Sequence, residues 1–169
     1  MKRYFAFASL VVCVFLMSGC HRVELPEGLP QPQPTILTFT QAGQPLADAQ
    51  ITLVPSDMSL IKFVMGGTTD AKGILDVYTM GNYRGVPAGD YSVVVTKNRD
   101  YYGEYEGQTK PDDMDTKEWG DLLLANKVTI HIVGEEYADA STTPFKITVK
   151  NGKNEFKFDD IPENETMPE

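Results

Sequence analysis

The sequence has few of the residues that most often carry chemistry. It contains two cysteines, Cys13 and Cys20, and two histidines, His21 and His131. Beyond residue 20 the chain therefore has no disulfide, thiolate metal ligand or cysteine nucleophile, and its fold must rest on the hydrophobic core alone. No G-x-S-x-G, H-E-x-x-H or Walker motif is present. The sequence thus predicts a non-enzymatic protein with no catalytic residue, no metal and no cofactor.

Basic side chains are also scarce. The chain has 15 Lys and Arg against 24 Asp and Glu, a net charge of −9. Removing residues 1–19 would delete Lys2 and Arg3 and no acid, which leaves 13 basic against 24 acidic side chains, or −11. Such a surface repels phosphate backbones, so the sequence predicts no nucleic-acid partner.

A hydrophobic run long enough to cross a membrane is missing too. Residues 4–17 are uncharged and mostly apolar, but a spanning helix needs about 20 such residues. The run follows Lys2 and Arg3, which is typical of a signal peptide. It ends in Leu-Met-Ser-Gly-Cys, residues 16–20, which resembles a bacterial lipobox. The resemblance implies a signal peptide over residues 1–19 and lipidation of Cys20; the alternative is an ordinary signal peptide in which Cys20 is incidental.

The next segment, residues 20–34, is rich in proline. Its four prolines favour polyproline II, so it could form a semi-rigid tether that holds a domain roughly 40 Å from the membrane at ~3.1 Å per residue. The alternative is a disordered tail. His21, rather than Asp, after the cysteine favours the outer membrane. We therefore expect an extracytoplasmic lipoprotein whose first partner is the membrane, through its N-terminal lipid.

From Thr35 onward, apolar and polar residues alternate in short segments. Strict alternation is typical of strands with one buried and one wet face, the usual habit of antiparallel sheets. Turn-forming stretches such as "TDAKG", "VPAGD" and "KNGKN" separate them. The pattern predicts an all-β fold, a β-sandwich of seven or eight strands over residues 35–160, followed by an acidic tail at 161–169. The apolar faces are Leu37 and Phe39; Ala49, Ile51 and Leu53; Tyr91, Val93 and Val95; Val128, Ile130 and Ile132; Phe145, Ile147 and Val149; Phe156 and Phe158.

The order of these segments resembles a known family. "GQPLADAQITLVP", "GGTTDAKGILDVYTM", "VPAGDYSVVVTK" and "EEYADASTTPFKITVKNGKNEFKFD" together are similar to the carboxypeptidase regulatory-like, or transthyretin-like, domain, as found in small lipoproteins of planctomycete-like bacteria. The resemblance implies a prealbumin-like sandwich without a catalytic centre of its own. It also implies a hairpin opening at Gly43, a turn at Asp70 and Gly73, and a last hairpin that turns at Asn151 and Gly152.

Residues 98–127 interrupt the alternation. A loop this long in a compact domain is usually functional or has an element of its own. Asp115 followed by Glu118 predicts the cap of a short helix, with Trp119, Leu122 and Leu123 packed on a sheet edge. In this structural interpretation the insertion covers the end of the sandwich.

Two ligand interpretations of the same insertion stay open. Tyr101, Tyr102 and Tyr105 lie beside several carboxylates and could stack on a sugar or bind a peptide. The acidic side chains of "PDDMD" could instead hold calcium, although the EF-hand pattern is missing. The sequence favours a structural or binding module at the cell envelope, with an unknown protein or glycan partner. A glycan-binding accessory lipoprotein that uses residues 101–119 is the main alternative, and a hydrolase built on acidic residues is a distant third.

Overall fold

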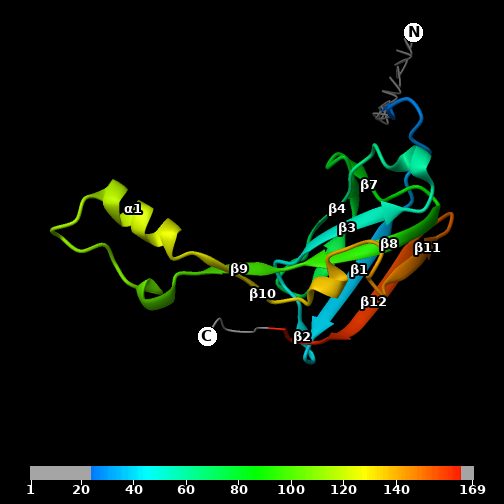
Figure 1. The fold of residues 1–169 in the computed structure, drawn as a ribbon. Helices are drawn as coiled ribbons and strands as arrows, with labels where there is room; N and C mark the ends of the chain where they lie inside the picture. Colours follow the sequence, from blue (N-terminus) through cyan, green and yellow to red (C-terminus); the bar gives the residue numbers. More distant parts are fainter. Residues whose placement is uncertain (1–23, 165–169) are drawn as a thin grey trace, which may run out of the picture.

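The computed structural model describes residues 24–164, which form a β-sandwich with one long projection (Figure 1). Cys20 and the last residues of the acidic tail lie outside the described residues. In the first sheet β1 lies between β12 on one side and β2 and β5 on the other. Its strands are β1 (Thr35–Gln41), β2 (Gln44–Pro45), β5 (Ile74–Asp76) and β12 (Asn154–Ile161).

The second sheet has six strands in the order β11-β8-β3-β4-β6-β7. The two longest, β8 and β3, are central and antiparallel, with Val93 opposite Leu53. The strands are β3 (Gln50–Pro55), β4 (Met65–Thr68), β6 (Tyr78–Thr79), β7 (Tyr83–Arg84), β8 (Gly89–Thr96) and β11 (Lys146–Val149).

The remaining elements are short. A two-stranded ladder, β9 (Asn98–Tyr101) with β10 (Val128–His131), carries the helix α1 (Thr116–Ala125) at its far end. Three 3-10 turns complete the described chain: η1 (Met58–Leu60), η2 (Gly103–Tyr105) and η3 (Glu135–Tyr137).

The core confirms the predicted β-sandwich. The inward sides of β1, β3 and β8 are fully buried, as alternation predicted, and Phe39 stacks on Phe158 with ring centroids 4.8 Å apart. Phe145, the residue before β11, packs on the same Phe158 ring with centroids 4.6 Å apart. The exception is Val128, which is exposed because β10 leaves the sandwich. The strands β2, β4, β7 and β9 add to the predicted set. Two of them, β2 and β7, have two residues each, which is too few to show alternation.

The predicted last hairpin is wrong. β11 pairs with β8 in one sheet, whereas β12 pairs with β1 in the other, and this second pairing is parallel. Asn154 holds the corner between them: its side chain accepts the Lys150 N–H and donates to the carbonyls of Lys150 and Gly152. The chain therefore crosses between the sheets at Gly152, and the apolar sides of β11 and β12 are buried in the same core.

The predicted turn before β5 is confirmed. One carboxylate oxygen of Asp70 accepts the backbone N–H groups of Lys72 and Ile74, both at 2.8 Å. These bonds stabilise the ionised carboxylate and lower the pKa of Asp70. Next to it, the buried Thr69 hydroxyl donates to Leu46 O and accepts the Ala49 N–H. This turn thus joins β2, β3 and β5.

The predicted free tether is wrong for the described residues 24–34. Leu29 and Pro32 are buried, and Leu25 packs against the core. Gln33 forms a backbone bridge with Val86, and the Tyr83 hydroxyl donates to Glu24 O at 3.2 Å. This proline-rich segment therefore lies along the sandwich, because Leu29 is part of the core and Leu25 packs against it. Composition alone indicated only that this segment is neither helix nor central strand.

Candidate functional site

The insertion forms an arm, defined here as residues 98–131, that projects from one end of the sandwich (Figure 1). The β9–β10 ladder runs outward from the pair Asn98–His131 to the pair Tyr101–Val128. At the base, Ile130 is 2% exposed. Beyond Val128 the arm has no buried residue, so its outer part depends on its own contacts for order.

The tip helix begins as predicted. Asp115 is the N-cap of α1, and its carboxylate accepts the Glu118 N–H at 2.9 Å. The helix does not pack on a sheet edge, however, and none of its residues is buried. Trp119 instead meets Tyr105 of η2 edge to face, with ring centroids 5.8 Å apart. The expectation that the insertion covers the end of the sandwich is therefore wrong, because α1 closes on its own loop.

Ion pairs brace the arm where hydrophobic burial is small. Lys127 Nζ lies 2.9 Å from an Asp100 carboxylate oxygen, across the ladder. This hydrogen bond with Asp100 raises the pKa of Lys127. Arg99 lies 3.7 Å from Glu106 and also sits over the Tyr101 ring, 5.8 Å from its centroid. The pairs are partly exposed, so each contributes little alone, and together they hold the segments of the arm to one another.

Two of the three tyrosines proposed as ligand contacts have their rings engaged within the arm. The Tyr101 ring lies under Arg99, and the Tyr105 ring lies against Trp119. The Tyr102 N–H donates to a Glu106 carboxylate oxygen. A hydrogen bond with Glu104 raises the pKa of Tyr105. All three residues are only partly covered, and the rings of Tyr101 and Tyr105 brace the loop of the arm.

The most accessible apolar side chains of the arm are different ones. Leu124, on α1, is 70% exposed, and Val128 is 42% exposed. The alternating pattern predicts a buried Val128, which is wrong, and it gives Leu124 no role. The helical position of Leu124, out of step with Trp119 and Leu123, was the available signal, but it indicates exposure only once the packed side of the helix is known.

The polar candidates do not assemble a reactive centre in the described part of the chain. Among residues 24–164 no three His, Cys, Asp or Glu side chains are placed to hold a metal ion. The carboxylate of Asp115 is occupied as a helix cap. The His131 side chain is 43% exposed, and its Nδ1 lies 2.9 Å from Asn98 Oδ1.

A shallow hollow of about 220 Å³ lies on the sandwich between β3, β4 and β6. Gln50, Val64 and Tyr78 contribute to its lining, and no carboxylate, histidine or lysine does. The hollow therefore offers apolar contact without a general acid or base. Among the residues described, no helix is both long and apolar enough to span a membrane.

Comparisons with known proteins identify no family. No family model matches the chain, and no curated protein matches its sequence. Among solved structures, the major pilin subunit of Bacillus cereus is similar at 15% identity and a TM-score of 0.40, over 80% of this chain and 31% of the pilin. A 9R-lipoxygenase from Cyanothece is similar at 12% identity and a TM-score of 0.36, over 81% of this chain and 18% of the enzyme. The chain thus spans less than a third of either protein, and scores this low support no statement about function.

The arm should be dispensable for the fold. Replacing residues 102–127 by a short turn that joins Tyr101 to Val128 should change the free energy of unfolding by no more than about 1 kcal/mol, since shortening a loop costs or gains little. Ile130→Ala is the control at the base of the arm, and it should cost about 2 kcal/mol or more. Denaturant unfolding of both variants gives the comparison. A trimmed protein less stable than Ile130→Ala would mean that the arm belongs to the core.

Proposed function

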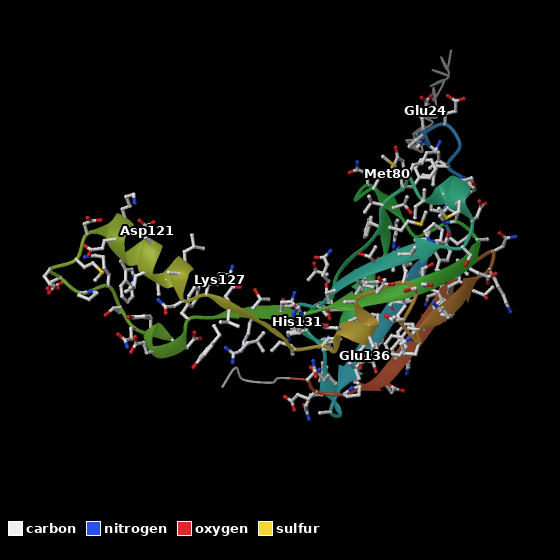
Figure 2. All side chains as sticks on the ribbon, in the orientation of Figure 1. Glu24, Met80, Asp121, Lys127, His131 and Glu136 are labelled. Atoms are coloured by element: carbon white, nitrogen blue, oxygen red, sulfur yellow. The ribbon has the colours of Figure 1, made fainter. Side chains whose placement is uncertain are left out.

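We propose that the protein is a lipid-anchored, extracytoplasmic module without catalytic chemistry, which presents its arm to a protein partner at the end of the sandwich away from the anchor. The observation that carries the proposal is the placement of the two ends. Glu24, four residues after Cys20, is held by Tyr83 at one end (Figure 2). At the other end Gln41, the last residue of β1, donates to Ile132 O beside the base of the arm. With the anchor at one end of the sandwich and the arm at the other, the arm would point away from the membrane.

The structural use of its polar residues supports a non-enzymatic role. Tyr91 is buried with its hydroxyl donating to Pro87 O, and burial raises its pKa to about 12. The buried Thr143 hydroxyl donates to Val93 O. These residues, with Thr69 and Asp70, belong to the stretches that resemble the carboxypeptidase regulatory-like domain. We infer membership of that family from their roles in holding turns and strands together.

A protein partner suits the arm better than a glycan does. Sugar-binding sites expose flat aromatic faces, whereas the Tyr101 and Tyr105 rings are engaged by Arg99 and Trp119. Leu124 and Val128 offer aliphatic contacts instead. A pull-down on insoluble polysaccharide separates the two: retention of the parent chain and its loss in Tyr101→Ala, with Leu124→Ser retained, would favour the glycan alternative and overturn the protein partner.

The anchor is tested by one substitution. Cys20→Ser should abolish incorporation of labelled fatty acid and move the protein out of the membrane fraction, because serine cannot form the thioether. Several acyl chains give stable attachment, since each buried CH₂ contributes about 0.8 kcal/mol. Cys13→Ser, inside the predicted signal peptide, is the matched control and should be labelled like the parent. Equal labelling of Cys20→Ser and parent would refute the lipoprotein proposal.

A further inference from the structure

The end of the sandwich near Glu24 has several exposed apolar side chains on its surface. Met58, Ile61 and Val64, in and after η1, are 70%, 50% and 73% exposed, and Met80, between β6 and β7, is 45% exposed. These four side chains are called the apolar end patch here. Figure 2 shows Met80 near Glu24, at the same end of the molecule. The Met80 N–H donates to Val64 O, which joins the two segments of the patch.

The backbone at Met80 indicates that its side chain has a purpose. Met80 and Gly81 both have left-handed φ, 53° and 72°, in the turn between β6 and β7. Turns of this kind favour Asn, Asp and Gly, and other side chains are strained there. At such a position an exposed methionine stabilises the sandwich neither through its backbone conformation nor through burial of its side chain. A contact outside the sandwich would explain it.

The length of chain before Glu24 decides what lies against this patch, provided that the proposed lipidation of Cys20 holds. Four residue steps separate Cys20 from Glu24 and span at most roughly 14 Å. A lipidated cysteine lies at the headgroup level, since its acyl chains occupy the hydrocarbon core. Because residues 24–34 are packed on the sandwich, no further spacer follows. The apolar end patch is therefore held beside the bilayer surface.

We propose that the apolar end patch docks on the lipid bilayer that carries the anchor. Met58, Ile61, Val64 and Met80 would enter the headgroup layer and set the orientation of the sandwich, with the arm pointing into the aqueous space. Lys62, whose amino group lies beside Gly28, adds a cation at the same surface. Glu24 and Glu27 are exposed nearby and the chain is acidic overall, so docking depends on apolar contact. Anionic lipid should not strengthen it.

The first experiment measures depth in the membrane. The full lipidated protein is placed in phosphatidylcholine vesicles with one introduced cysteine carrying a fluorophore, at Val64→Cys or at Leu124→Cys, which is equally exposed but on the arm. Lipids with a nitroxide at the headgroup quench the probe. Quenching at 64 should exceed quenching at 124 severalfold, and adding phosphatidylglycerol should not increase it. Equal quenching at both sites in protein that floats with the vesicles would overturn docking and leave the anchor intact.

A second variant separates docking from mere proximity. In a Met80→Cys probe protein, Ile61→Ser with Val64→Ser should lower the quenching severalfold while flotation persists, whereas Leu124→Ser should change neither. Unchanged quenching would overturn the role of the patch. Burial of the probe that rises with protein concentration and resists lipid quenchers would show that a second copy covers the patch, which also overturns docking. Failure of the parent to float would refute the anchor, and docking with it.

Discussion

Val93→Asp is expected to unfold the sandwich. Val93 is fully buried at the centre of β8, opposite Leu53, and its backbone N–H donates to Phe145 O. The described buried polar residues are threonines and one asparagine, so no buried cation could pair with the new carboxylate. An unpaired charge or its protonated form costs several kcal/mol there, which is comparable with the 5–15 kcal/mol that stabilises a typical domain. Circular dichroism and a thermal melt measure the loss.

The neighbouring residue supplies the control. Val94 lies on the outer side of the same strand and is only partly covered. Val94→Asp has the same change of charge and the same β-propensity cost, and its carboxylate stays in water, so it should cost no more than about 1 kcal/mol. If both variants melted together, either the face assignment of β8 or the sandwich itself would be wrong.

The inner faces could be predicted from the sequence because a two-residue period has one physical cause. Leu37, Ile51 and Val95 are buried for the same reason: a sheet with one wet face sorts side chains by parity. The pairing partners are a different matter. Alternation does not say whether β12 follows β11 in one sheet or crosses to the other, and here Asn154 makes the crossing stable.

The position of the arm could not be predicted from the sequence, for a different reason. The cap at Asp115 and the helix after it are local and were predictable. Whether Trp119 covers the sandwich or meets Tyr105 depends on the direction in which β9 and β10 leave β8, and this direction is fixed by contacts such as Gln41 with Ile132 O that are distant in sequence. The moderate apolarity of α1 is compatible with both positions of Trp119.

The proline-rich segment shows the same limit. Its prolines correctly exclude a helix, but an extended backbone is equally suited to a free spacer and to a segment packed on the sandwich. Leu29 decides between them by filling a place in the core. Residues 24–34, which pack on the sandwich, are called the strap here. Because the strap shortens the free chain after Cys20, this single packing contact changes the expected distance from the membrane, and with it the part of the surface that lipid can reach.

Gly85→Ala is expected to detach this strap. An ideal Cβ on Gly85 would lie 2.0 Å from Gln33 O and 2.9 Å from Pro34 N, both backbone atoms that cannot move without breaking the bridge between Gln33 and Val86. Gly85 also has a φ of +93°, which alanine adopts only with strain. We expect a loss of at least about 3 kcal/mol, from lost bridge hydrogen bonds of about 1 kcal/mol each, the strain, and exposure of Leu29. Denaturant unfolding measures the loss, and hydrogen exchange at the Gln33 and Val86 amides localises it.

Gly81→Ala separates the clash from the backbone strain. Gly81 has a comparable φ of +72°, but an added Cβ there meets no atom within 4 Å. Alanine at this position should therefore cost only the left-handed conformation, about 1 kcal/mol, and should leave the Gln33 and Val86 amides protected. Equal losses at the two glycines would mean that residues 24–34 do not pack on the sandwich as the structure shows. A larger loss of stability at Gly85, with rapid exchange at the Gln33 amide, would show that the close approach of the Gly85 and Gln33 backbones holds the strap on the sandwich. The short length of free chain after Cys20 would then depend on this contact.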